Sequence, residues 1–544
     1  MTATTTEAAG PGHRRVAGPA PRDARAMRAA GWVAVGLVAL LAIGAFVLLG
    51  REALRGETTF GSAASLWRVV RFTLWQAGLS TLLSLAFGVA LARALSRRPR
   101  FAGRGLLVAL LALPLVIPAL VASLAIIGVW GRQGLLNDLI ASSGLDRVSI
   151  YGLPGILIAH VFFNMPLAAR LLLRHLAAVP AERWRLAAQL GLSPLATWRL
   201  IEWPAIRPHL GGIATLVFAL CATSFAVVLT LGGGPRSTTL EVAIYQALRF
   251  DFEPGRAVAL AFVQLALTGT LALMLRGRSA ELATDGVATP KRYGRADRIG
   301  LAADTATIAA AAAFLAGPLV MLVLDGLGSD LTRLLAEPAV HGAILTSLAL
   351  GLLAATLAIA LTLALVLGAH AGGRALETGA GAVASLILVV PATVIGAGWF
   401  LALRGTGAVF SAAPVMIVIV NAAMALPFTM RVVGPAWARH AARVDRVALS
   451  LGMGGLSRAW RLDWPAMRAA LALGFALALA LSLGDLGVVA LFGSQDWTTL
   501  PLLLLQRMGS YRTDDAAGLA LILGALCLAV VACAQLLERG RTVT

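Results

Sequence analysis

The sequence predicts an all-α polytopic membrane protein with about twelve transmembrane helices in two homologous six-helix halves. Three observations support this prediction. Hydrophobic residues make up 59% of the 544 residues and charged residues only 13%, and a water-soluble chain of this length could not bury so much apolar surface. Apolar stretches of membrane-spanning length recur along the chain. Polar residues of the second part of the chain repeat those of the first.

Twelve apolar stretches reach the length needed to cross a bilayer. The first six lie near residues 31–50, 72–92, 105–130, 150–169, 210–231 and 257–275. The second six lie near residues 303–325, 343–369, 379–403, 409–430, 469–493 and 516–536. All twelve are expected to be helices facing lipid, since an open segment in a bilayer satisfies its backbone polar groups only within a helix.

The distribution of basic residues predicts the orientation of the chain in the membrane. With the N-terminus in the cytoplasm, the inner segments hold 32 of the 45 Lys and Arg residues and the outer segments hold 13. Cytoplasmic loops carry such an excess in membrane proteins, so both termini are expected in the cytoplasm. The run 31–50 follows 30 polar, Arg-rich residues and is long enough to remain as a span rather than a cleaved signal peptide.

Charge and cysteine content exclude two other kinds of site. The formal net charge of +19 does not indicate nucleic-acid binding, because the basic residues form short clusters between apolar runs. The three cysteines Cys221, Cys527 and Cys533 lie inside apolar runs without the His spacing of a metal site. We therefore expect neither nucleic acid as a partner nor a bound metal.

The polar segment 276–300, which contains Gly and Pro, divides the twelve spans into six and six. The expected organisation has two halves, a first over 31–275 with its core at about 72–275 and a second over 301–536 with its core at about 343–536. A basic cytoplasmic tail over 1–30 precedes them, a cytoplasmic linker over 276–300 joins them, and a cytoplasmic tail over 537–544 follows them.

A constant offset of 261 residues relates polar positions in the two halves. It joins Pro166 to Pro427, Arg170 to Arg431, and Trp203-Pro204 to Trp464-Pro465. Chance similarity between apolar segments would not keep polar residues in register, so the pattern indicates an internal duplication. Duplicated halves of a transporter face each other, and we expect a pathway at their pseudo-symmetric interface.

Within the repeat, the basic segment LAAQLGLSPLATWRLIEWPAIRP at 186–208 lies between two spans on the cytoplasmic side. Gly191 is expected to end one helix in the left-handed conformation. Ser193 and Pro194 suit the N-cap and first position of a second, short helix. That helix is expected to stop before Pro204, because the residue before a proline resists the helical conformation.

A second copy of this segment repeats the plan with Gly452, Ser457, Trp460 and Pro465. One interpretation is a loop that only returns the chain to the membrane. The fixed Gly-to-Pro spacing in two copies instead favours a pair of docking helices for a cytoplasmic partner.

These two segments resemble the EAA loop of type-I ABC importer permeases, whose short coupling helix binds in a groove of the ATPase subunit. Four further stretches, at 78–95, 151–173, 231–257 and 484–517, are similar to the fused two-domain permeases of thiamine and thiamine pyrophosphate importers. The resemblance covers nearly the whole chain after residue 60. It implies that the ATPase-coupling positions are Ala187, Gly191, Ser193, Pro194, Trp203, Pro204, Ala448, Gly452, Trp464 and Pro465.

The chain departs from this family at the two positions of the conserved glutamate. Arg185 and Arg446 occupy them. An ion pair from that glutamate to the ATPase is therefore not expected, and docking would depend more on shape and apolar contact.

No motif for ATP hydrolysis is present in the sequence. A P-loop requires a lysine after its glycines, and the only lysine, Lys291, follows Pro290. The chain is therefore expected to be a permease and not an enzyme, to bind no cofactor, and to use ATP that a partner subunit hydrolyses. The alternative of a different class is a secondary transporter driven by an ion gradient, which would need ionisable residues within several spans.

Few polar residues lie in the predicted spans. Candidates for a translocation pathway are His160, Asn164, Asn421 and Asp485. A carboxylate at Asp485 suits a positively charged substrate such as thiamine, although this residue between Gly484 and Gly487 is also placed to cap a helix. His160 is also compatible with a packed, hydrogen-bonded side chain.

The resemblance also implies the partners and the location. These are a cytoplasmic ABC ATPase homodimer, a periplasmic thiamine-type binding protein docking on the outer loops 232–256 and 494–515, and the bacterial inner membrane with its lipid. The sequence leaves open whether the substrate is thiamine, its phosphates, ferric iron or another small solute.

Overall fold

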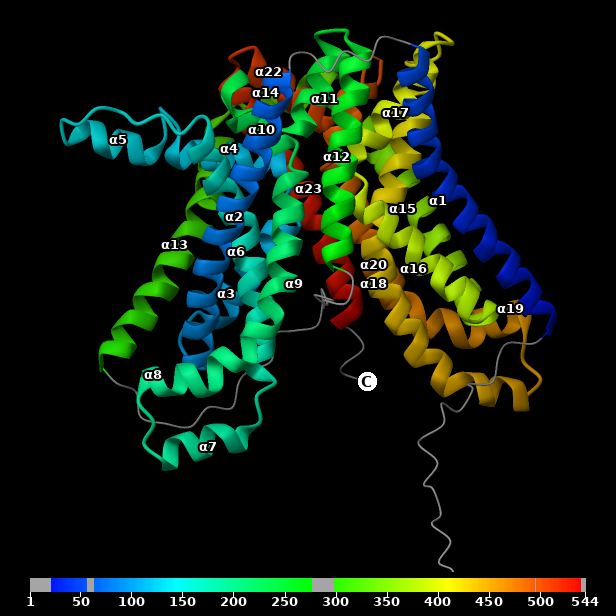
Figure 1. Cartoon of the computed structure of the whole chain (residues 1–544), viewed down its shortest axis with the longest axis horizontal. Coiled ribbons are helices and arrows are strands. Elements are labelled where there is room, and N and C mark those ends of the chain that lie inside the picture. The colour runs from blue at the N-terminus through cyan, green and yellow to red at the C-terminus, as the bar shows by residue number, and fades with distance from the viewer. Residues whose placement is uncertain (1–20, 56–62, 276–297, 495, 540–544) are drawn as a thin grey trace, which may run out of the picture.

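The structure, a computed structural model, describes residues 21–55, 63–275, 298–494 and 496–539 (Figure 1). These parts of the chain form helices and contain no strand. Eleven of the helices in them are long and apolar enough to cross a membrane, or twelve if the bent pair α16–α17 is one span. The prediction of an all-α polytopic membrane protein is therefore confirmed.

The described residues of the first half form twelve α-helices. They are α1 (Pro21–Arg55), α2 (Ala63–Arg97), α3 (Arg104–Leu110), α4 (Ala119–Trp130), α5 (Leu135–Ser142), α6 (Leu153–Ala177), α7 (Ala181–Gln189), α8 (Pro194–Thr197), α9 (Trp203–Ala222), α10 (Ala226–Leu231), α11 (Leu240–Arg249) and α12 (Pro254–Leu275).

The second half forms eleven. They are α13 (Arg298–Gly328), α14 (Leu331–Ala336), α15 (Pro338–Gly372), α16 (Arg374–Val389), α17 (Ala392–Arg404), α18 (Ala413–Ser450), α19 (Gly455–Arg458), α20 (Trp464–Leu483), α21 (Gly487–Phe492), α22 (Leu500–Gly509) and α23 (Thr513–Arg539).

Four predicted spans are not single helices. The stretch at 210–231 is broken between α9 and α10, and its counterpart at 469–493 is broken between α20 and α21. The stretch predicted at 105–130 is broken between α3 and α4, where Pro114 and Pro118 interrupt the apolar run. The stretch at 379–403 bends by 88° between α16 and α17, at Pro391. Proline lacks the N–H that would continue the helix and keeps the residue before it out of the helical region, which explains the breaks at 105–130 and 379–403.

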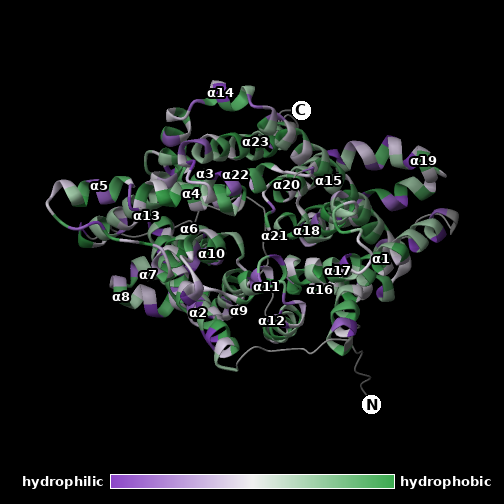
Figure 2. Ribbon diagram, turned by 90° about the horizontal axis from the view of Figure 1, so that it is seen from above, coloured by the Kyte–Doolittle hydropathy of each residue, from purple (hydrophilic) through white to green (hydrophobic). Residues whose placement is uncertain are grey.

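The duplication is visible in matching hydrogen bonds. In the first half the backbone N–H of Leu240 donates to Thr73 Oγ1 at 3.1 Å, and in the second half that of Leu500 donates to Ser347 Oγ at 2.8 Å. Each bond ties a short helix (α11 or α22) to the long helix that begins the core of its half (α2 or α15). Viewed from above, the two cores lie on opposite sides, with α10, α11 and α21 between them (Figure 2).

The first helix of each half packs on the other half. Helix α1 contacts α15, α16 and α17, and α13 contacts α2 and α4 (Figure 1). The α1–α15 contact depends on small residues, because a Cβ added to Gly31 would lie 2.9 Å from the Cα of Gly368. Small residues allow such close approach of helices in membranes. The exchange of first helices joins the two halves into one body.

Candidate coupling loops and the cavity between the halves

The two copies of the EAA-like segment lie at the same end of the molecule, one below each half (Figure 1). In the first copy, α7 precedes the turn and α8 follows it. In the second copy, the long helix α18 runs into the turn without a break, and α19 follows it. Both loops therefore extend the helix bundles in the same direction.

The glycine turns have the predicted conformation. Gly191 has φ of +59° and Gly452 has φ of +62°, the left-handed region that favours glycine. In each turn the residue after the glycine donates its N–H to the carbonyl of a buried alanine, Ala187 at 3.0 Å or Ala448 at 2.8 Å. This six-residue closure is that of a Schellman motif and satisfies a carbonyl at the helix end.

The short helices after the turns are capped differently. In the first copy Ser193 Oγ accepts the N–H of Ala196 at 3.2 Å and Pro194 is the first helical residue, as predicted. In the second copy Gly454 occupies the cap position and has no side chain to do this. There the N–H of Gly455 donates to Asp23 of α1 at 2.6 Å, so the first helix of the chain supplies an acceptor at that helix start.

The prediction that each short helix ends before its Trp-Pro pair is wrong. The chain continues through a five-residue π-helical turn, Trp198–Glu202 or Ala459–Asp463, directly into α9 or α20. Pro204 and Pro465 occupy the first turn of the following helix, where a missing N–H costs no hydrogen bond. The wider turn changes the hydrogen-bond register at this point, so the coupling loop is joined to a membrane helix without a flexible break.

The outer face of each loop carries exposed apolar side chains at matching positions. Leu190 and Leu195 are 65% and 59% exposed, and their counterparts Leu451 and Leu456 are 66% and 84% exposed. Exposed leucines in two identical settings indicate a contact surface rather than chance exposure. The sequence analysis missed these residues, although their recurrence at the 261-residue offset was visible.

Arg185 and Arg446 occupy the positions at which the resembled family has glutamate. Both arginines are exposed, so this departure lies at the surface of each loop and not in its interior.

An acidic side chain in each π-helical turn joins the loop to a long helix. In the first half Glu202 is buried and accepts hydrogen bonds from Arg93 at 2.7 Å and Arg97 at 3.3 Å, both on α2. In the second half its counterpart Asp463 is 2.7 Å from His440 of α18 and 3.3 Å from Arg458 within the loop. These contacts hold the turns against the long helices.

Three of the four predicted pathway residues lie in contacts within one half. His160 Nδ1 is 3.0 Å from Ser80 Oγ, and Asn164 Nδ2 donates to the backbone oxygen of His160 at 2.9 Å. Asn421 Nδ2 donates to Ser482 Oγ at 3.0 Å. All three are buried between the helices of their own half. Of the three, Asn421 lies close enough to Asp485 for its side chain to interact with that carboxyl, whereas His160 and Asn164 interact within the first half.

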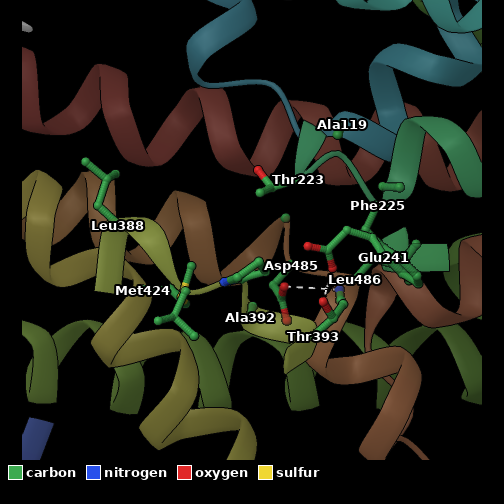
Figure 3. Close-up of a pocket in the computed structure, with 15 residues that line it drawn as sticks. Ala119, Thr223, Phe225, Glu241, Leu388, Ala392, Thr393, Met424, Asp485 and Leu486 are labelled. Atoms are coloured by element: carbon green, nitrogen blue, oxygen red, sulfur yellow. Dashed lines mark hydrogen bonds between the residues drawn. The ribbon is translucent and has the colours of Figure 1, made fainter. Parts of the chain in front are cut away.

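Asp485 lies in a cavity of about 250 Å³ between the two halves (Figure 3). Its Oδ1 accepts the N–H of Gly487 at 3.1 Å, next to the start of α21, which is the capping role considered from the sequence. The cavity is also lined by Glu241 of α11, which the sequence analysis did not identify. No local pattern marked it, because Glu241 lies in a mixed segment that reads as an outer loop.

Comparison with known proteins agrees with these features. Residues 84–277 match the family described as the binding-protein-dependent transport system inner membrane component. The chain is 52% identical to the thiamine transport system permease protein ThiP of Brucella abortus (strain 2308), over 92% of this chain and 94% of that protein. It is 41% identical to ThiP of Escherichia coli (strain K12), over 91% and 95% of the two chains.

A more distant relative covers only part of the chain. The sulfate transport system permease protein CysW of Synechococcus elongatus is 28% identical over 43% of this chain and 78% of its own length. Similarity at 40–50% identity over nine-tenths of the chain is thus found with the thiamine transport permeases. The chain belongs to the family of thiamine transport system permeases, which are inner membrane components of binding-protein-dependent transport systems.

Proposed function

We propose that this chain is the translocating subunit of an ATP-driven importer that carries thiamine across the inner membrane. Two identical ATPase subunits bind the cytoplasmic end, one on each coupling loop. The observation that carries this proposal is the pair of loops at one end of the molecule, each with a left-handed glycine turn and the same exposed leucines. Two copies of one surface suit two copies of one partner.

The arrangement of the loops gives a mechanism for the use of ATP. When ATP draws the two ATPase subunits together, the coupling loops that they hold approach each other. Each loop is continuous with a long helix through its π-helical turn and is joined to a second one by the contact of Glu202 with Arg93 or of Asp463 with His440, so the motion is transmitted to the whole half. The halves then rock about their interface, and the cavity between them changes the side to which it opens.

The opposite end of the molecule supplies the contact for a binding protein. Helices α11 and α22, within the outer segments 232–256 and 494–515, lie at the end away from α7 and α19 (Figure 1). A periplasmic thiamine-binding protein docks there and releases its ligand into the interface. The start of α1 is tied to the second coupling loop by Asp23, which supports a cytoplasmic N-terminus, and the positive-inside count supports the same side for both termini.

Thiamine, with its phosphates, is preferred over ferric iron because the relatives that match most of this chain are thiamine transport permeases. The experiment is competition in vesicles that contain the permease, the ATPase and the binding protein. Unlabelled thiamine should abolish uptake of labelled thiamine, while ferric iron should leave it unchanged. Equal competition by ferric iron would contradict the assignment of the substrate.

A further inference from the structure

Buried acidic side chains among the described residues of this protein are paired with arginines, except for one that lines the cavity. Five acidic residues are buried in the described part of the chain. Four of them have an arginine within ion-pair distance: Glu202 with Arg93, Asp304 with Arg98, Asp445 with Arg458, and Asp515 with Arg512. Burial of an unpaired charge is costly, and the fold avoids this cost at these four sites.

Glu241 is the fifth, and it has no basic partner among the described residues. Its side chain is 1% exposed. Oε1 accepts the amide of Gln264 at 3.1 Å, and Oε2 accepts the hydroxyl of Thr393 from the second half. These neutral donors orient the carboxylate but do not balance its charge.

A second carboxylate without a cation lines the same cavity. Asp485 Oδ1 accepts the N–H of Gly487, and the side chain of Asn421 also interacts with this carboxyl. These donors are neutral, so they do not balance its charge. Both Asp485 Oδ1 and the Thr393 methyl group lie 3.6 Å from the position that a Cβ on Gly487 would occupy. Thr393 therefore lies between the two acidic groups, one from each half (Figure 3).

The cavity lies on the pseudo-symmetry axis of the molecule. Its wall includes Ala119 in the segment VIPALV and Ala392 in the matching segment VVPATV. It also includes Thr223 and Gly484, which are related by the 261-residue offset. A site on this axis is lined by the surfaces that separate when the halves rock, which is where a transported molecule must pass.

The polar groups of the cavity break that symmetry. The position of Glu241 is a proline in the second half, Pro501, and the position of Asp485 is a serine in the first half, Ser224. The residues of the cavity wall therefore occur in both copies of the repeat, whereas each carboxylate occurs in one copy only. The two acids are thus not a by-product of the repeat.

We infer that this cavity is a binding site for an organic cation, with Glu241 and Asp485 as the two groups that balance its charge. The inference rests on the proposed function, since thiamine carries a fixed positive charge on its thiazolium ring. A volume of about 250 Å³ is slightly below the roughly 300–1,000 Å³ of small-molecule pockets. It accommodates one ring of a two-ring ligand in this conformation, and the charged ring is the one that the carboxylates select.

The test removes the charges and keeps the size of both side chains. Glu241→Gln and Asp485→Asn are isosteric, and asparagine still caps a helix. The assay uses vesicles with the ATPase and the loaded binding protein. The amount of labelled thiamine taken up per ATP hydrolysed should fall about tenfold or more in the double variant, and tenfold corresponds to about 1.4 kcal/mol. Stimulation of ATP hydrolysis by the binding protein should remain at the wild-type level.

Two further variants make the result decisive. Glu241→Asp keeps the charge and should retain most uptake. Asp138→Asn is the matched control, because it removes a carboxylate whose side chain is 58% exposed and which is far from the cavity residues in the sequence. This control should not change uptake. Wild-type uptake per ATP in the double variant, or equal losses in Glu241→Asp and Glu241→Gln, would overturn the cation site. Absence of thiamine uptake by the wild-type complex would instead contradict the proposed function.

Discussion

At the scale of single residues, the coupling loops depend on backbone conformation more than on side-chain packing. A Cβ added to Gly191 or Gly452 would meet nothing within 4 Å. The space at both turns is therefore open, and only the positive φ restricts the residue. Most L-residues avoid this region, whereas asparagine enters it at low cost.

This property separates two substitutions at the same site. Gly191→Val or Gly452→Val forces a β-branched residue to φ near +60°, at a cost of roughly 1–3 kcal/mol, and should displace the short helix that follows. We expect thiamine uptake to be lost while the amount of protein in the membrane is unchanged. Gly191→Asn and Gly452→Asn should keep uptake near the wild-type level. Wild-type uptake in both valine variants would refute the role of the turns in coupling.

The interface residue Glu241 shows what a single sequence conceals at this scale. Asp485 stood out from the sequence because it lies in an apolar run, whereas Glu241 lies in a mixed segment that reads as an outer loop. Its burial follows from the packing of α11 against α12 and α17, a tertiary contact that no local pattern predicts. His160 and Asn164 stood out equally, and the structure places them in helix contacts within the first half.

At the scale of elements, each coupling loop is a rigid unit with an apolar outer face. The turn was predictable from the glycine, serine and proline residues, because each of these has a strong local preference. The π-helical turns Trp198–Glu202 and Ala459–Asp463 were not predictable from the sequence. Each contains an acidic residue whose partner lies on a neighbouring helix, and this is a tertiary contact. Likewise, Pro118 and Pro391 break apolar runs whose composition alone indicates a continuous span.

The exposed leucines of these elements predict how the ATPase is held. Replacing Leu195 and Leu456 with aspartate removes apolar contact and places charge in the docking groove. The double variant should fail to co-purify with the ATPase, and its own thermal stability should not change, because both side chains are exposed. Leu145→Asp, at a residue 66% exposed on another loop, is the matched control and should co-purify normally. Retention of the ATPase by the double variant would show that docking occurs elsewhere.

At the scale of the whole molecule, the two halves are held together by exchange of their first helices. The two halves and their duplication were predictable from the sequence, because polar residues of the first half recur in the second half at a constant offset. It did not predict that α1 and α13 lie on the opposite halves, since apolar periodicity does not identify the partner of a lipid-facing helix.

Two glycines on α1 test this exchange. Gly31→Leu should clash with Gly368 and Leu376, separate α1 from α15 and lower the unfolding temperature of the purified protein. Gly36→Leu should be tolerated, because an added side chain there meets nothing within 4 Å. Thermal unfolding in detergent measures both. Equal stability of the two variants would contradict the packing of α1 against the second half.

The central claim is that ATP hydrolysed by a partner drives thiamine through this chain. Uptake of labelled thiamine into vesicles, with ATP trapped on the side of the coupling loops and the binding protein on the other, measures it most directly. The account predicts thiamine accumulation that requires both ATP and the binding protein and survives when ion gradients are collapsed. Accumulation that needs an ion gradient and proceeds without ATP would contradict it.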